Sequence, residues 1–265
     1  MEEEFQFLGL RKFIRINWLK APKNLQLNHV KDTPLPYIKE LTKPIAVGRT
    51  LEYLAGWIHS QSLASALPPH VLDPKPWDRV YDATAAPGSK TTQMAMLMEN
   101  KGTIYATDKA PRLRALRANV ERLGVLNTFM KVWDAKKPFP LSYNKALLDA
   151  PCSALGSHKY AWERLTPSIV RTLSLVQKDM IKAVFENLEP GGVMVYSTCT
   201  TTYEENEGVI EWLLENFQNA KLEEVKLPVP AQDAQPKQYE DVKVAKRVSA
   251  RDAGEAFFIA RIRKA

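Results

Sequence analysis

Short β-prone runs and amphipathic helical runs alternate along most of the chain. The predicted strands cover residues 79–82, 103–108, 128–132, 145–148, 193–197, 222–227 and 256–262. Apolar residues at helical spacing lie between them, most clearly over 111–123 and 169–188, and a shorter helical run covers 93–99. This alternation predicts an α/β fold, a doubly wound and mainly parallel seven-stranded sheet with helices on both faces.

The first fifty residues follow a different pattern. Residues 12–19 form a β-prone run, and Pro22, Pro34, Pro36 and Pro44 exclude long helices, although 37–41 has the composition of a helical turn. We expect a small α+β subdomain over 1–50 and a main domain over 51–265. Within the main domain, a helix in the second half of 51–67 should be interrupted by Pro68-Pro69, and His59 should be structural because nothing nearby orients it.

The segment 79–93 predicts a strand, a tight turn at Pro87-Gly88 and the start of a helix. The exposed N–H groups of a helix start, beside a glycine, suit the anionic end of a small ligand. A nucleotide P-loop is excluded because Ser89 separates Gly88 from Lys90 and no upstream glycine exists, and a dinucleotide fingerprint needs three spaced glycines. An ordinary strand-to-helix turn remains the alternative.

The composition is that of a globular protein and excludes several classes of protein. The chain has 265 residues, 45% hydrophobic and 25% charged, as in globular proteins, and its net charge of +7 fits a polyanionic partner or serves solubility. Since no apolar run approaches the roughly 18 residues of a membrane span and the start is acidic, we expect a cytoplasmic protein without membrane contact. Two cysteines exclude a disulfide framework and a cysteine-rich zinc site, and no metal is expected.

Polar side chains follow the ends of the predicted strands, where ligands bind in this architecture. Asp108 could hold a ribose hydroxyl pair and Asp134 an adenine amino group, although each could instead cap the following helix. Cys152 and Cys199 follow two successive strands, so their thiols should face one pocket. Apolar burial and a disulfide are the alternatives to nucleophilic chemistry.

Basic residues gather near the end of the sequence. They form either a solvated edge or a phosphate-contacting strip, and they are Lys243, Lys246, Arg247, Arg251, Arg261, Arg263 and Lys264.

Several motifs closely resemble those of the Sun-type RNA cytosine-5 methyltransferases. They are Ala85-Ala-Pro-Gly-Ser-Lys-Thr91, Asp149-Ala-Pro-Cys152-Ser153, and Tyr196-Ser-Thr-Cys199 followed by Glu204-Glu-Asn-Glu207. Further matches are Arg15-Ile-Asn-Trp-Leu-Lys20, the segment 53–68 with Gln61, and the run 257–264. The resemblance covers nearly the whole chain in the same order.

This resemblance implies a class I, Rossmann-like methyltransferase that moves a methyl group from S-adenosylmethionine to carbon 5 of a cytosine in RNA, tRNA rather than rRNA. Cys199 would add to carbon 6 of the ring, Cys152 would assist proton removal and product release, and Asp149 would interact at N3. The target base would have to leave its stack to reach this pocket.

The resemblance also implies the ligand contacts. Gly88 and Lys90 should lie near the amino-acid end of the cofactor, Asp108 near its ribose and Asp134 near its adenine. The full set of expected cofactor contacts is Thr84, Ala85, Ala86, Pro87, Gly88, Ser89, Lys90, Asp108, Arg112, Asp134 and Asp149. RNA contacts are expected from Lys159, Arg164, Arg247 and the region 1–50, and the protein is expected to be a monomer.

The chain departs from the family pattern after Cys152. Ala154 occupies a position where the family usually has glycine, and the loop 155–165 is short. Two other functions stay open. A DNA cytosine-5 methyltransferase would use Cys152 as the nucleophile, and a non-catalytic RNA-binding assembly factor could share the same fold.

Overall fold

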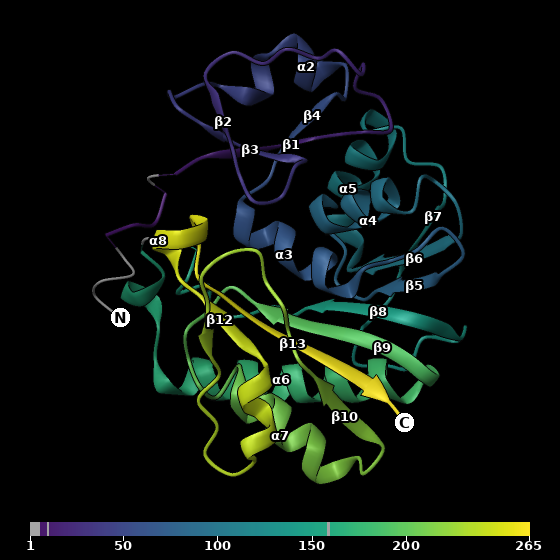
Figure 1. Ribbon diagram of the computed structural model, residues 1–265. Helices are drawn as coiled ribbons and strands as arrows, with labels where there is room; N and C mark the ends of the chain where they lie inside the picture. The colour runs from purple at the N-terminus through teal and green to yellow at the C-terminus, as the bar shows by residue number, and fades with distance from the viewer. Residues whose placement is uncertain (1–5, 10, 158–159) are drawn as a thin grey trace.

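The computed structural model describes residues 6–9, 11–157 and 160–265. Its elements form a small sheet near the N-terminus and a large sheet covered by helices on both faces (Figure 1). The expected α/β fold class is confirmed. Within the described residues the large sheet has nine strands in the order β11-β12-β13-β9-β8-β5-β6-β7, with β10 paired to β13.

The centre of the large sheet is parallel. It contains β5 (Arg79–Asp82), β6 (Thr103–Asp108), β7 (Thr128–Val132), β8 (Tyr143–Asp149) and β9 (Leu188–Thr198). Most residues of β5, β8 and β9 are buried, as expected for strands with helices on both faces. All five strands therefore direct their carboxyl ends to one edge.

The other strands pair antiparallel and extend the sheet on the β9 side. They are β10 (Ala220–Glu223), β11 (Gln232–Asp233), β12 (Lys246–Val248) and β13 (Phe257–Lys264). The expectation of seven strands omitted β11 and β12. These strands are two and three residues long and polar, so they have no hydrophobic alternation of their own, and their pairing depends on β13.

Helices cover the two faces with separate apolar clusters. In Figure 1, α3 (Leu63–Leu72), α4 (Ser89–Leu97) and α5 (Ala110–Arg122) lie on one face, while α6 (Pro167–Glu186) and α7 (Glu207–Asn216) lie on the other. The start of α6 follows its sequence, since Thr166 accepts a hydrogen bond from the Ile169 N–H and Pro167 occupies the first turn. The start of α7 at Glu207 has no side-chain cap, and Thr202 Oγ1 just before it donates to the Glu205 carboxylate at 2.9 Å.

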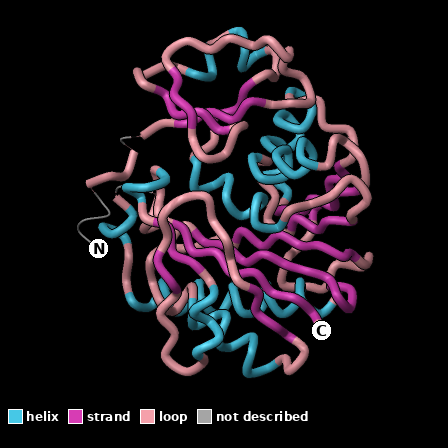
Figure 2. Tube along the Cα trace, in the orientation of Figure 1, coloured by secondary structure: helices cyan, strands magenta, loops and turns pink. Residues whose placement is uncertain are grey.

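The small sheet has the order β2-β3-β1-β4. Its strands are β1 (Phe13–Ile16), β2 (Val30–Asp32), β3 (Ile38–Leu41) and β4 (Ile58–Ser60). The helical turn expected over 37–41 is wrong, because these residues pair with β1 as β3. The sheet also runs past residue 50, since β4 pairs with β1, whereas the division of the chain into two domains stays a prediction. Figure 2 shows the helices α3, α4 and α5 between the small and the large sheet.

Pro68 and Pro69 lie inside α3 instead of interrupting it. A proline has no N–H, so Pro69 leaves the carbonyl of Ser65 without its helical donor. The side chain of Gln61 supplies one, at 3.3 Å from Nε2 to that carbonyl. Both prolines are buried, and their burial against the large sheet offsets the lost backbone bonds.

Short helical segments complete the described chain. They are α2 (Leu51–Leu54), α8 (Ala250–Ala253) and the 3-10 turns η1 (Val47–Arg49), η2 (Ala161–Arg164) and η3 (Glu240–Val244). Among the described residues, no helix combines the length and the apolar character that crossing a membrane requires.

Candidate active site

Both cysteines lie at the edge where β8 and β9 end. These neighbouring parallel strands place Asp149 opposite Ser197, and each cysteine follows two or three residues later. The Sγ atoms of Cys152 and Cys199 are 3.3 Å apart, close enough for one thiol to donate a hydrogen bond to the other. The two thiols therefore come together as expected, and the pocket that they would face stays a prediction.

The contact between the thiols separates their acidities. The hydrogen bond to Cys199 and burial raise the pKa of Cys152 well above that of a free thiol. For Cys199, the hydrogen bond from Cys152 lowers the pKa and outweighs the effect of burial. Of the two thiols, Cys199 therefore loses its proton more readily and has the greater thiolate character.

The carboxylate of Asp149 lies between the thiols and the first turn of α4. Its Oδ2 accepts from Lys90 Nζ at 2.7 Å and its Oδ1 from Ser197 Oγ at 2.8 Å. Burial lowers the pKa of Lys90, but the adjacent carboxylate more than compensates, so the pKa is raised overall. Lys90 also donates to Ser65 and lies 5.1 Å from the ring centroid of Phe257.

The loop between β5 and α4, together with the first two residues of that helix, holds the expected cofactor residues Thr84 to Lys90. Gly88 has φ +105°, and a Cβ atom there would lie 2.8 Å from Leu116 Cδ1, so both the backbone conformation and the close packing require glycine. No side chain caps the start of α4, whose first N–H groups are left for another acceptor. Thr84 Oγ1 donates to the carbonyl of Asp149 and connects this loop to the end of β8.

The acids expected beside the cofactor follow the next two strands. Asp108 is buried, and its carboxylate accepts from the N–H of Ala86 at 2.9 Å and of Lys109 at 2.7 Å. Arg112 donates to the Ala86 carbonyl at 2.6 Å and lies 3.4 Å from Asp108. Asp134 follows β7 and is exposed. Asp108 thus also holds the loop in place, and a carboxylate retains lone pairs for further donors.

Asp82, at the end of β5, is an acid to which the sequence pattern gave no role. It is buried and accepts from Thr91 Oγ1 at 2.6 Å. Burial raises the pKa of Asp82 to about 7, and the hydrogen bond only partly opposes this shift. A raised pKa means that the folded protein favours the neutral form of this side chain.

His59 links the small sheet to the loop. Arg122 donates to Nδ1 at 2.8 Å, so Nε2 carries the proton and donates to Ser89 Oγ at 2.9 Å. Burial, together with the charges of Arg15 and Arg122, lowers the pKa of His59 to about 3 and keeps the ring neutral. A structural role agrees with the expectation, but its stated reason was wrong, because two groups orient this ring.

Arg15 of β1 makes a second link to α4. Its buried guanidinium donates to the Ser89 carbonyl at 2.5 Å, to Gln61 Oε1 at 2.6 Å and to Thr92 Oγ1 at 2.7 Å. Burial lowers the pKa of Arg15 to about 9, which still leaves it charged at neutral pH. The sequence motif around Arg15 gave no indication of this contact, since its partners lie far away along the chain.

Glu205 holds the two cysteine-bearing loops together. Its buried carboxylate accepts four hydrogen bonds, from Ser153 N at 2.9 Å, Ser153 Oγ at 2.5 Å, Thr202 Oγ1 at 2.9 Å and Gln177 Nε2 at 3.0 Å. Ser153 follows Cys152 directly, and its hydroxyl also lies 2.7 Å from Thr200 Oγ1. The position of each thiol therefore depends on this carboxylate.

Ala154 follows in the same loop with φ +59°. This left-handed conformation favours glycine, which the family resemblance led us to expect at this position. The backbone keeps the glycine-like conformation although the side chain differs.

The residues expected to contact RNA are less clearly placed. Lys159 lies outside the described residues, and Arg164 is the last residue of η2. Arg247 is described in full. It forms a two-pronged ion pair with the buried Glu207, through Nε at 2.6 Å and Nη2, and donates to the Thr201 carbonyl at 3.0 Å. Arg247 therefore supports the loop after Cys199, and its contact with RNA stays a prediction.

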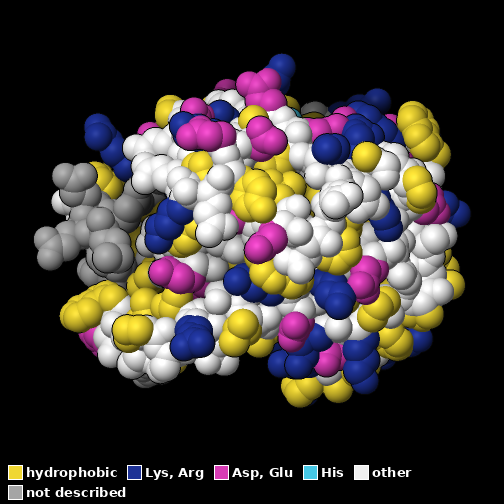
Figure 3. Space-filling model, turned by 90° about the horizontal axis from the view of Figure 1, so that it is seen from below, with side chains coloured by type: hydrophobic (Ala, Val, Ile, Leu, Met, Phe, Trp, Pro, Cys, Tyr) yellow, Lys and Arg dark blue, Asp and Glu magenta, His cyan; other side chains and the backbone are white. Residues whose placement is uncertain are grey.

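Most other basic residues near the end of the sequence are also ion-paired. Lys243, Lys246, Arg261 and Arg263 each contact a carboxylate, and Lys264 donates to backbone carbonyls. On the face shown in Figure 3, Lys and Arg side chains are interspersed with Asp and Glu. These ion pairs favour the solvated edge over a phosphate-contacting strip, which stays a prediction.

Comparison with known proteins gives consistent matches. The family model of the 16S rRNA methyltransferase RsmB/F matches residues 69–263. A tRNA (cytosine(49)-C(5))-methyltransferase of Pyrococcus abyssi is 41% identical over 98% of this chain and 90% of its own length. A tRNA (cytosine(72)-C(5))-methyltransferase of Pyrococcus horikoshii is 44% identical over 64% of this chain and 44% of its own length.

The fold is matched as well. The solved structure of NSun6 from Pyrococcus horikoshii with SFG, an analogue of S-adenosylmethionine, has a TM-score of 0.87 at 25% identity and covers 99% of this chain and 94% of its own. Not all matches extend over the whole partner. The chain spans about half the length, 48%, of the Ribosomal RNA small subunit methyltransferase F of Vibrio campbellii.

Replacing the carboxylate of Glu205 should loosen both cysteine-bearing loops. In Glu205→Gln the amide nitrogen cannot accept, so at least one buried donor loses its partner, and we expect the free energy of unfolding in urea to fall by about 1–3 kcal/mol. Iodoacetamide should also alkylate the thiols faster. Glu204→Gln, one residue away and exposed, is the matched control and should change neither value. Equal results for both variants would contradict the role of Glu205.

The raised pKa of Asp82 predicts a specific pH dependence. An unfolded aspartate has a pKa of about 3.9, so between this value and about 7 the folded state binds the proton more readily, and stability falls as pH rises through this window. In Asp82→Asn this contribution is absent. Urea unfolding at a series of pH values should therefore show the wild type losing stability relative to Asp82→Asn from about pH 4 to 7. The exposed Asp241→Asn should track the wild type, and parallel curves for Asp82→Asn and wild type would contradict the raised pKa.

Proposed function

The chain belongs to the RsmB/F family of RNA cytosine-5 methyltransferases, and we propose that it transfers a methyl group from S-adenosylmethionine to carbon 5 of a cytosine in tRNA. The observation that carries this proposal is the contact between two thiols of unequal acidity beside a carboxylate. Cytosine carbon 5 is a weak nucleophile, and a covalent bond to carbon 6 would enrich it.

We assign the attack on carbon 6 to Cys199. Its pKa is lowered while that of Cys152 is raised, so the thiolate needed for attack is favoured on Cys199. This difference also supports an RNA-type over a DNA-type mechanism, because the DNA enzymes would use the other cysteine. The Sγ–C6 bond forms and electron density moves to carbon 5 and N3 of the ring.

Cys152 would then remove the proton from carbon 5. In the resting protein, both the hydrogen bond to Cys199 and the charge of Cys199 raise the pKa of Cys152. Once Cys199 is bonded to carbon, its sulfur no longer carries a negative charge, and these two causes are lost. The pKa of Cys152 would therefore fall in the adduct, so its own proton could pass to solvent and leave a thiolate. After carbon 5 has accepted the methyl group, this thiolate would take the carbon 5 proton. The electrons of that C–H bond would restore the ring double bond as the Sγ–C6 bond breaks and Cys199 leaves as a thiolate.

Asp149 and Lys90 would stabilise the charge that develops on the ring. Asp149 would contact the N3 side, and its ion pair with Lys90 brings an ammonium next to the same place. The structure directs Lys90 towards Asp149 and Ser65. We therefore propose that Lys90 serves the base as well as the amino-acid end of the cofactor, the role expected from the sequence.

The residues at the loop fit S-adenosylmethionine, which supplies an electrophilic methyl group when bound. The uncapped start of α4 and Gly88, where a side chain would not fit, suit its carboxylate. Asp108 would accept from the ribose hydroxyls, and the exposed Asp134 from the adenine amino group. We keep Thr84, Ala85, Ala86, Pro87, Ser89 and Arg112 in the proposed cofactor site.

We prefer tRNA as the substrate over rRNA because the match to a tRNA methyltransferase extends over almost the whole of both chains. Bisulfite sequencing of tRNA and rRNA incubated with the protein and S-adenosylmethionine tests this directly. Protected cytosines should appear in tRNA, and protection confined to rRNA would change the substrate. A monomeric state and a cytoplasmic location stay predictions.

The roles of the two thiols predict opposite behaviour of two variants. Cys152→Ala should accumulate a covalent protein–RNA adduct, because the intermediate forms but is not released, and Cys199→Ala should form none. Denaturing gel electrophoresis with labelled tRNA separates the adduct from free protein. The double variant is the control for non-specific linkage. Adducts with Cys199→Ala but not with Cys152→Ala would assign the attack to Cys152.

A further inference from the structure

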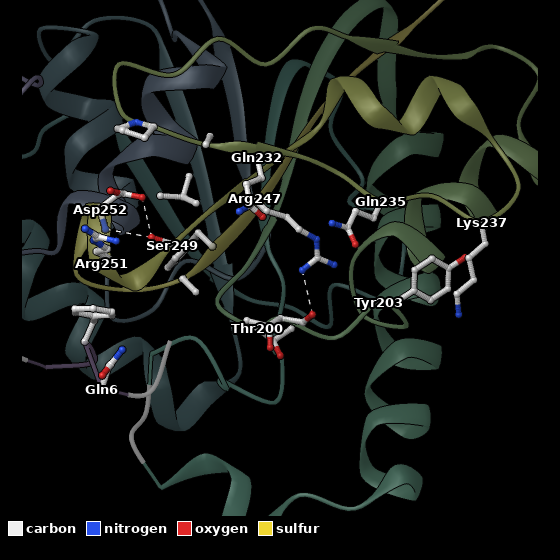
Figure 4. A pocket seen from close by; sticks show the side chains of 17 residues that line it. Gln6, Thr200, Tyr203, Gln232, Gln235, Lys237, Arg247, Ser249, Arg251 and Asp252 are labelled. Atoms are coloured by element: carbon white, nitrogen blue, oxygen red, sulfur yellow. Dashed lines mark hydrogen bonds between the residues drawn. The ribbon is translucent and has the colours of Figure 1, made fainter. Parts of the chain in front are cut away.

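A cleft of about 940 Å³ opens beside the loop that carries Cys199. Thr200 and Thr201 line it, and so does Phe257, whose ring centroid lies 5.1 Å from Lys90 Nζ. Figure 4 shows Gln6 and Arg251 on one side, Tyr203 and Lys237 on the other, and Arg247 and Thr200 between them. The cleft therefore opens beside Thr200, the residue that follows the proposed nucleophile in the chain.

Lys237 and Arg251 lie on opposite sides of the cleft and, unlike most basic residues near the end of the sequence, are not ion-paired within the described part of the chain. Among the described residues, neither Lys237 nor Arg251 has a carboxylate within ion-pair distance. Each lies over an aromatic ring instead, Lys237 Nζ at 3.9 Å from the ring centroid of Tyr203 and the Arg251 guanidinium at 6.0 Å from that of Phe7. A cation over a ring keeps N–H donors for an anion.

Two acids at the cleft already have partners. Glu207 is paired with Arg247, and Asp252 accepts from Ser249 Oγ at 2.8 Å. Gln232 and Gln235 add exposed side-chain amides, which can meet the donors and acceptors of a base edge. A site for single-stranded nucleic acid combines cations that contact the phosphates with aromatic rings and amides that contact the bases. A site for an acidic peptide would need only the cations.

We propose that this cleft binds the single-stranded RNA next to the target cytosine, with Lys237 and Arg251 each contacting a phosphate. The inference rests on the proposed function and adds the path of the strand. A strand crossing from Arg251 to Lys237 passes over Thr200, next to Cys199 in the chain. Binding here would hold the RNA while its cytosine enters the pocket, so the two cations act on affinity and not on the chemical step.

The test compares the double variant Lys237→Ala/Arg251→Ala with Lys226→Ala/Lys243→Ala. The control removes two exposed lysines of equal charge that lie outside the cleft and are paired with Glu224 and Glu240. Fluorescence anisotropy with a twelve-nucleotide oligocytidine should show about tenfold weaker binding for the cleft variant. The slope of log K against log salt should fall by about 1.4, two contacts at about 0.7 each for a single strand.

Kinetics with tRNA separate this proposal from the proposed function. The cleft variant should have a raised KM for tRNA, with kcat and the affinity for S-adenosylmethionine unchanged. A wild type that methylates tRNA, together with a cleft variant whose affinity and salt slope match the control, would overturn the cleft and leave the function intact. A wild type that methylates no RNA would overturn the function itself. An equal loss of binding to polyglutamate would identify an acidic-protein site and overturn the RNA assignment.

Discussion

The parallel pairing of β8 with β9 is the constraint on which the site depends. Its register puts Asp149 opposite Ser197, and the chain after each strand then reaches the same point with one sulfur. A slip of one residue would turn the side chains of a strand to the opposite face and separate the thiols. The carboxylate of Glu205 stabilises the same arrangement, because it accepts hydrogen bonds from Ser153 in the loop after β8 and from Thr202 in the loop after β9.

The small sheet contributes to the site by holding the loop between β5 and α4. Arg15 and His59 both reach Ser89, one at its carbonyl and the other at its hydroxyl. The described partners of the Arg15 guanidinium are neutral oxygen atoms. Hydrogen bonds to these atoms, and not an ion pair, therefore stabilise this buried positive charge. The small sheet and the main sheet therefore share one set of buried polar contacts at the cofactor loop.

Sequence patterns predicted the parts of the fold that have their own hydrophobic signal. The strands at 103–108 and 128–132 have the bounds expected, and the two thiols meet as expected, because strand alternation and chain order determine which ends are neighbours. The patterns missed what depends on distant partners. Pro68 and Pro69 are accommodated by Gln61 and by burial, β11 and β12 pair only because β13 is present, and Arg247 is held by Glu207. The role of Glu205 was also missed, although the acidic run that contains it was part of the family resemblance.

The position of β13 in the sheet has a consequence for biosynthesis. It pairs along β9 from Phe258 opposite Thr198 to Arg263 opposite Val193, yet it is translated long after both cysteines. Until β13 leaves the ribosome, one edge of β9 lacks its partner, and an open edge of this kind invites pairing with other chains. The wall that Phe257 provides beside Lys90 is missing for the same interval. A nascent chain would therefore carry both thiols before it can enclose them.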